Sequence, residues 1–207
     1  MPYDRTSTPR PTVIQTAQRV LRTEGEALLA MIDRLPPDFE PAVAKILAAR
    51  GRVILSGIGK SGHIARKIAA TLSSTGTPAY FVHAGEASHG DMGTITPADI
   101  VIALSNSGET AELGDLIAHT RRFGIVLMAI TGAERSTLAQ AADFRLTLPD
   151  APEACSMGLA PTTSTTMALA LGDALAIALM ESRGFAPEHF RTFHPGGKLG
   201  ARLARVG

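Results

Sequence analysis

The stretch IVIALSNSGETAE (residues 100–112) is an apolar run that breaks into small hydroxyl residues and a glycine. Five apolar residues bounded by turn formers predict a strand buried on both faces, and the apolar spacing of residues 111–123 predicts a helix after it. Free backbone N–H groups and the dipole at a helix N-terminus favour an anion, so we expect a phosphate on this turn, although the same side chains are common helix caps. We expect Ser105, Ser107 and Thr110 to hold it, and Asn106 to contact the same ligand.

The rest of the chain alternates between strand and helix patterns from Arg52 to Leu148, which predicts an α/β fold with a parallel sheet and helices on both faces. Two helices, over residues 13–35 and 39–49, precede the first strand. Further strands are expected at residues 52–56, 79–82, 125–130 and 144–148. Further helices are expected after the turn at residues 57–62, running to about residue 74, and at residues 136–142 and 162–183. Ligands in such sheets bind beyond the carboxyl ends of the strands, where both glycine-containing turns of this chain are expected.

Composition narrows the function classes. The chain has 207 residues, long enough for one sizeable core, and we expect a flexible segment at residues 1–12 followed by a single domain at residues 13–207. Lys and Arg number 20 against 19 Asp and Glu, with no basic stripe, so nucleic acid is a poor candidate partner.

No unbroken apolar run has the length of a membrane span, because Gly172 and Asp173 interrupt residues 167–180, and no apolar signal segment opens the chain. We therefore expect a cytoplasmic protein.

The turn GIGKSG (residues 57–62) follows the first predicted strand and matches the glycine spacing of dinucleotide-binding turns. Those turns need an acidic residue at the end of the next strand to hold the ribose, and here the next strand ends in His83. A P-loop is excluded too, because its leading glycine would fall on Ile54. We therefore expect Gly59, Lys60 and Ser61 to contact a ligand without a nucleotide cofactor.

Two more segments carry polar groups. His83, Glu86 and His89 lie in HAGEASHGDMG (residues 83–93) and are metal ligands by type, but hydrogen-bonding histidines are more common in loops, and we expect no metal. We place His89 among the substrate-binding residues instead. Five hydroxyl residues, Thr162 to Thr166, open the last long helix, more than one cap requires; we expect Thr162 and Thr163 to bind substrate, with helix packing as the competing interpretation.

These motifs, together with EACSMGLAPTTSTT (residues 153–166) and HPGGKLG (residues 194–200), resemble the sugar isomerase (SIS) family, and within it the isomerases of D-arabinose 5-phosphate. The resemblance implies a three-layer sandwich around a five-stranded, parallel, flavodoxin-like sheet, and a tetramer. It implies interconversion of D-ribulose 5-phosphate and D-arabinose 5-phosphate for the synthesis of Kdo, a lipopolysaccharide sugar, with no cofactor. The four site positions of this family are occupied here by Lys60, Glu112, Glu153 and His194.

Two other functions stay open at this point. One is an SIS isomerase of another sugar phosphate, and the other is a regulatory module that binds a sugar phosphate without converting it. Isomerisation through a cis-enediol needs a base, a second group that moves the hydroxyl proton and a positive charge near the enediolate. We expect Glu153 or Glu112 to be the base, with Glu153 favoured because it lies in a loop, Lys60 to stabilise the enediolate, and His194 to open the ring or relay a proton.

Overall fold

The structure is a computed structural model, and it describes residues 11–186. The strands are β1 (Val53–Gly57), β2 (Ala79–His83), β3 (Ile100–Leu104), β4 (Val126–Thr131) and β5 (Phe144–Thr147). The α-helices are α1 (Val13–Ile32), α2 (Phe39–Leu47), α3 (Gly59–Ser74), α4 (Ala84–Ala87), α5 (Gly114–Phe123), α6 (Thr137–Ala141) and α7 (Thr163–Ser182). Two short 3₁₀ helices are η1 (Asp91–Thr94) and η2 (Ala111–Leu113).

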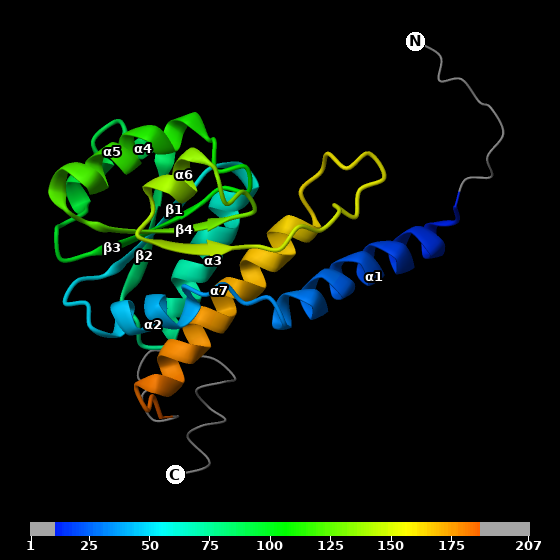
Figure 1. Ribbon diagram of the computed structural model, residues 1–207, viewed down its shortest axis with the longest axis horizontal. Helices are drawn as coiled ribbons and strands as arrows, with labels where there is room; N and C mark the ends of the chain where they lie inside the picture. Colours follow the sequence, from blue (N-terminus) through cyan, green and yellow to red (C-terminus); the bar gives the residue numbers. More distant parts are fainter. Residues whose placement is uncertain (1–10, 187–207) are drawn as a thin grey trace, which may run out of the picture.

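All five strands are parallel and their order is β2-β1-β3-β4-β5, so the expected flavodoxin-like sheet is confirmed. Alternate residues of each strand point to opposite faces, and each face has its own apolar core. Ile102 on β3 packs into the core beneath α2, α3 and α7, whereas its neighbour Val101 packs into the core beneath α4, α5 and α6. Helices therefore cover both faces of the sheet, as the three-layer expectation required (Figure 1).

The register brings the carboxyl ends of the central strands level with one another. Gly57, the last residue of β1, pairs with Leu104, the last residue of β3, and Leu104 pairs with Ile130 near the end of β4. The strand order reverses between β1 and β3, because β1 leads outward to β2 and β3 leads the other way to β4. The turns after β1 and β3 thus lie side by side at the reversal point, where sheets of this type bind ligands.

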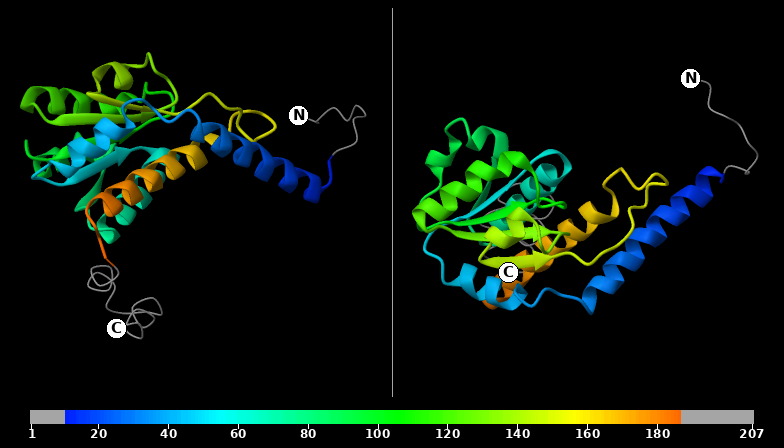
Figure 2. Two further views of the ribbon diagram at one scale, coloured as in Figure 1. Left: turned by 60° about the horizontal axis from the view of Figure 1, so that its bottom comes forward. Right: turned by 45° about the horizontal axis from the view of Figure 1, so that its top comes forward.

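Helix α1 begins with a complete capping box. Thr12 Oγ1 accepts a hydrogen bond from the backbone N–H of Gln15, and the Gln15 side chain accepts one from the N–H of Thr12. The helix contacts α7 but extends away from the body of the domain (Figure 2). Only Ala27 and Met31 are buried on it, whereas five large apolar side chains are 66–85% exposed: Val13, Ile14, Leu21, Leu29 and Ile32. One side of α1 therefore presents apolar surface that residues 11–186 do not cover.

Helix α7 is long and apolar, but it packs against the rest of the domain. By length and mean hydropathy alone, this helix could cross a membrane. Gly172 and Asp173 interrupt its apolar sequence, however. Within its apolar 18-residue window, 44% is buried inside the domain. Helices α1, α2 and α3 all contact α7. Gly172 lies against α3, since a side chain there would come 2.3 Å from Ile68. The helix therefore has the packing role that was predicted for residues 167–180.

The structure also changes the start of the helix after β3. One helix was predicted over residues 111–123, but the chain forms η2 first and the α-helix begins only at Gly114. The segment at residues 83–93, predicted as a loop, contains α4 and η1. Residues 1–10 and 187–207, which include His194, lie outside the described residues.

Candidate active site

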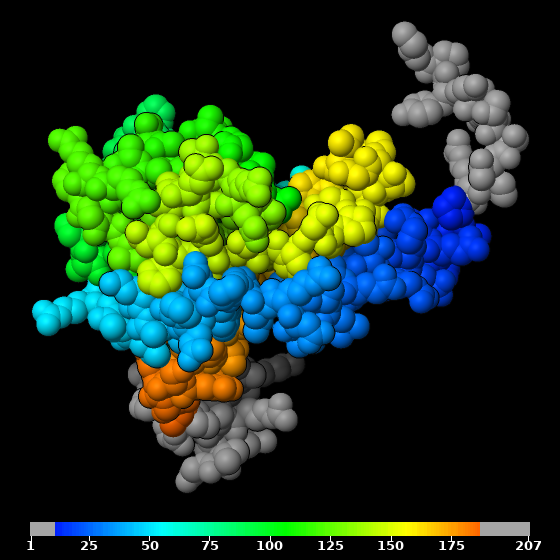
Figure 3. Space-filling view, viewed as in Figure 1, coloured from blue at the N-terminus to red at the C-terminus, as the bar shows by residue number. Residues whose placement is uncertain are grey.

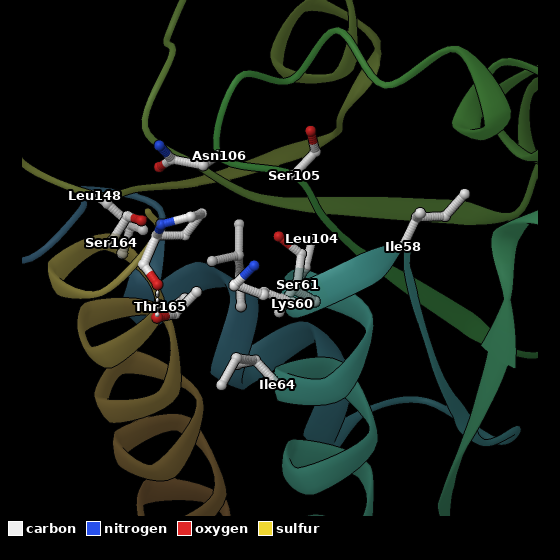
Figure 4. A pocket seen from close by; sticks show the side chains of 13 residues that line it. Ile58, Lys60, Ser61, Ile64, Leu104, Ser105, Asn106, Leu148, Ser164 and Thr165 are labelled. Carbon is white, nitrogen blue, oxygen red and sulfur yellow. Dashed lines mark hydrogen bonds between the residues drawn. The ribbon is translucent and has the colours of Figure 1, made fainter. Parts of the chain in front are cut away.

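A pocket of ≈ 220 Å³ opens at the reversal point of the sheet, between the first turn of α3, the turn after β3 and the start of α7 (Figure 4). Its apolar walls come from both flanking helices and the strand ends. Its polar groups are Lys60, Ser61, Ser105, Asn106, Ser164 and Thr165. An apolar cavity with a few converging polar groups is the usual form of a small-molecule site.

Lys60 and Ser61 reach the pocket because β1 and α3 approach each other closely. Gly57 has no room for a side chain, since a Cβ would lie 3.0 Å from the carbonyl oxygen of Leu104, and a Cβ on Gly62 would lie 2.8 Å from the oxygen of Gly57. Gly59 has a φ of +56°, in the left-handed region that glycine adopts easily. The predicted glycine turn therefore exists, and it places Lys60 in the first turn of α3.

The turn after β3 is held by its own side chains. Ser105 Oγ and Thr110 Oγ1 are 2.7 Å apart, and Ser105 Oγ accepts a hydrogen bond of 3.0 Å from the N–H of Gly108. Ser105 is buried at the pocket wall, next to the exposed Asn106. Gly108 has a φ of +65°, and a Cβ there would come 1.9 Å from Ser136 Oγ. Ser105 and Asn106 thus face the pocket where the phosphate was expected.

Ser107, in contrast, faces away from this pocket. It lines an open depression on the other side of the turn, shared with Glu109 and the segments around residues 134 and 149. Glu109 accepts hydrogen bonds of 2.8 and 2.7 Å from the N–H and hydroxyl of Thr137, and the Thr137 hydroxyl is the main reason why the pKa of Glu109 lies below its usual value. The turn is therefore fastened to the start of α6.

Glu153 is bound to the N-terminus of α7. Its Oε2 accepts hydrogen bonds from the N–H of Thr162 (2.7 Å), the hydroxyl of Thr162 (3.0 Å) and the N–H of Ser164 (3.4 Å). Its Oε1 accepts one from the hydroxyl of Ser164. Partial burial would raise the pKa of Glu153, but the bonds from Ser164 and Thr162 together outweigh burial and lower it. The carboxylate is therefore held in its ionised form beside the pocket, although it does not line the pocket itself.

The hydroxyl run at the start of α7 divides between the core and the pocket. Thr163 is buried, and its Oγ1 has no hydrogen-bond partner among the described residues, while Thr162 binds Glu153. Ser164 and Thr165 line the pocket instead, together with Ala168 one turn later. The sequence indicated that some of these hydroxyls face a ligand but selected Thr162 and Thr163; the helical spacing of residues 164, 165 and 168 was the signal that could have identified the right ones.

Other expected residues lie away from the pocket. Glu112 is exposed on η2 and His89 is exposed between α4 and η1, and neither lines it. His83 Nδ1 is buried and without a hydrogen-bond partner in the part of the chain that the structure describes. Within residues 11–186, no three His, Cys, Asp or Glu side chains are grouped as a metal site would need. The roles of Glu112, His89 and His194 stay predictions.

One contact was not foreseen. The guanidinium of Arg19 on α1 donates a hydrogen bond of 2.6 Å to the carbonyl oxygen of Ala154, the residue after Glu153. Figure 3 shows the loop around residue 155 lying against α1. The two groups are separated by 135 residues, so no local pattern could have predicted the contact. The loop that carries Glu153 is therefore supported from both α1 and α7.

Known proteins are similar in sequence to this chain over most of its length. The SIS domain family model matches residues 46–178. The chain is 54% identical over 190 residues to arabinose 5-phosphate isomerase KdsD of Pseudomonas aeruginosa, covering 92% of this chain and 58% of that protein. Its identity to the protein of the same name from Escherichia coli K12 is 50% over 189 residues, covering 91% and 58%. The chain therefore spans 58% of the length of these curated relatives.

Solved structures share the fold of this chain. A protein of Escherichia coli CFT073 in complex with arabinose 5-phosphate superposes with a TM-score of 0.86 at 40% identity, covering 88% of this chain and 97% of that one. A sugar-phosphate isomerase candidate from Listeria monocytogenes superposes with a TM-score of 0.87 at 26% identity, covering 92% and 100%.

Proposed function

Because this chain belongs to the SIS domain family, we propose that it is an aldose-ketose isomerase that interconverts D-ribulose 5-phosphate and D-arabinose 5-phosphate. The observation that carries the proposal is the pocket in which Lys60 and Ser61 meet Ser105 and Asn106, with Glu153 hydrogen-bonded to Ser164 at its wall. The names of the curated relatives and the arabinose 5-phosphate bound by the similar Escherichia coli protein support this substrate.

We place the 5-phosphate at the turn after β3. Ser105 and Asn106 line the pocket, and the Ser105 hydroxyl is already paired with that of Thr110. A phosphate accepts hydrogen bonds, so the Ser105 hydroxyl can turn its proton toward it while Thr110 holds Ser105 in place. The Lys60 ammonium, on the opposite wall, adds a positive charge in a partly apolar cavity, where it counts for more than in water.

The chemistry moves two protons. A base takes the C2 proton of arabinose 5-phosphate, which leaves a cis-enediolate, and the same base returns the proton to C1, while a second group carries the proton of the C2 hydroxyl to the C1 oxygen. We assign the base to Glu153, which is ionised and next to the pocket, and the stabilisation of the enediolate to Lys60. Glu112 and His194 are retained as proposed participants, and no metal or organic cofactor enters these steps.

We further propose that the protein acts as a homo-oligomer in the cytoplasm, most simply the tetramer that the family resemblance implies. The exposed apolar side chains of α1, such as Leu21 and Leu29, support self-association, because residues 11–186 leave this helix face uncovered. A neighbouring copy of the chain is then the natural cover for this face. Light scattering on the purified protein tests this directly, and a monomer at micromolar concentration would refute it.

The test of the activity is a panel of pentose and hexose phosphates, including ribulose 5-phosphate, arabinose 5-phosphate and a hexulose 6-phosphate, with and without a chelator. We expect turnover of the arabinose and ribulose pair, unchanged by chelation. Turnover of a hexulose phosphate alone would instead favour an isomerase of another sugar. Binding without turnover would favour a regulatory module.

A further inference from the structure

Ser164 is the link between Glu153 and the pocket. Glu153 does not line the pocket, but the Ser164 side chain does, from the first turn of α7 opposite Lys60 (Figure 4). The Ser164 hydroxyl donates a hydrogen bond to Glu153 Oε1, and the residue is 6% exposed. The backbone of α7 holds Oε2 of Glu153 but not Oε1. A side chain at the pocket wall, that of Ser164, holds Oε1 instead.

We propose that Ser164 is a positioning residue for Glu153: its hydroxyl holds Oε1 at the wall of the pocket, so that the carboxylate faces the substrate. This proposal deepens the proposed isomerase function and rests on it. Thr162 has a different task, because both of its hydrogen bonds to Glu153 end on Oε2.

The need for such a residue follows from the geometry of a glutamate side chain. The torsion that turns a carboxylate about its own axis has a broad and shallow energy profile, so it is not fixed by rotamer preference. Hydrogen bonds to Oε2 hold one end of the group but leave the direction of Oε1 free. The Ser164 bond to Oε1 removes that freedom. A small misplacement of a reacting group costs a large part of its rate enhancement, so this bond should be visible in the kinetics.

The charges around Glu153 do not compete with this bond. Asp150 and the Cys155 thiol lie on the same loop as Glu153. Arg19 on α1 binds the carbonyl oxygen of Ala154, and Lys60 lies on α3. None of them forms an ion pair with Glu153 among the described residues. Asp173, further along α7, pairs with Lys67 on α3 instead. Removing the Ser164 hydroxyl therefore changes a neutral donor and leaves the local charges as they are.

The decisive experiment is a ¹³C NMR titration of the glutamate carboxyl groups in the full chain, with the Glu153 signal assigned by its loss in Glu153→Gln. We expect Ser164→Ala to move the Glu153 titration to higher pH, because the ionised form loses a donor. Thr165→Ala is the matched control, because Thr165 lines the same pocket but donates only to backbone carbonyl oxygens, and it should leave that titration in place. Ser164→Thr keeps a hydroxyl and should restore the behaviour of the unsubstituted protein.

Kinetics supply the second readout. We expect kcat/KM of Ser164→Ala to fall about 10-fold, which corresponds to about 1.4 kcal/mol, and its acidic limb to move to higher pH. An unmoved Glu153 titration in Ser164→Ala would overturn the proposal; if this variant folds poorly, Ser164→Cys, a weaker donor, decides by the same shift. If the unsubstituted protein fails to convert arabinose 5-phosphate, the proposed function fails, but the titration still decides the role of Ser164.

Discussion

Replacing Glu153 by glutamine separates its proposed role as a base from its structural role at the start of α7. The amide keeps one oxygen, which can still accept the two hydrogen bonds from Thr162. Its NH₂ group then faces the Ser164 hydroxyl, which can accept as well as donate. What is lost is the negative charge beside the helix N-terminus, a contribution of ~0.3–1 kcal/mol. We therefore expect the free energy of unfolding to fall by only about 1 kcal/mol.

The effect on catalysis should be far larger. A positioned base contributes about 10²- to 10⁴-fold, so we expect kcat of Glu153→Gln to fall by that factor while KM changes little. Glu112→Gln is the matched control, since Glu112 is exposed on η2 and makes no hydrogen bond or ion pair among the described residues. Its kcat should exceed that of Glu153→Gln by at least an order of magnitude.

The assay follows the conversion of arabinose 5-phosphate by both variants, with urea unfolding measured in parallel. Equal and small losses of kcat in the two variants would refute the assignment of the base to Glu153. A large loss of stability in Glu153→Gln without a loss of kcat per folded molecule would show that Glu153 serves only to cap α7.

Three further predictions concern the supports of the site and of the sheet that carries it. Arg19→Ala removes the hydrogen bond to the Glu153 loop, so kcat/KM should fall about 3- to 10-fold, whereas Arg22→Ala, on the same helix without such a bond, should not change it. Asp99→Ala should lower stability by about 1–3 kcal/mol for each donor left unpaired, because buried Asp99 accepts from the backbone N–H groups of Arg52 and Thr96. These bonds outweigh burial and lower the pKa of Asp99, so their stabilisation is present above its unfolded pKa and is lost as the pH falls through the folded value. The urea midpoints of the unsubstituted protein and Asp99→Ala should therefore converge in acid, and a difference that persists undiminished there would contradict this. Gly108→Ala should raise KM and lower the unfolding midpoint, because its φ is positive and a methyl group would meet Ser136; an unchanged KM would separate the turn from substrate binding.

The fold was predictable because its strands carry a simple signal. Residues 100–104 are apolar without alternation, which is the pattern of a strand buried on both faces, and both cores of the sheet do receive residues from β3. The location of the pocket was predictable for a related reason. Parallel strands end at one edge, so the turns after Gly57 and Leu104 had to lie together. The placement of Lys60 and Ser105 at the pocket follows directly from that rule.

The details of the site were not predictable from local patterns. The position of Glu112 depends on η2, a tight turn that delays the α-helix to Gly114 and leaves Glu112 exposed. The bond between Glu153 and Ser164 crosses a loop of irregular structure, where no period indicates which side chains meet. The contact of Arg19 with that loop joins distant parts of the chain. Each of these features depends on tertiary packing.

The measurement that tests the central claim most directly is a proton NMR spectrum of D-arabinose 5-phosphate incubated with the protein in D₂O. A base that moves a proton between C1 and C2 exchanges some of it with solvent. We predict that ribulose 5-phosphate signals appear while the C2 proton signal of arabinose 5-phosphate decays, and that Glu153→Gln slows both changes about 100-fold or more. A sugar phosphate that binds, as judged by line broadening, but keeps its C2 proton and forms no ketose would contradict the account.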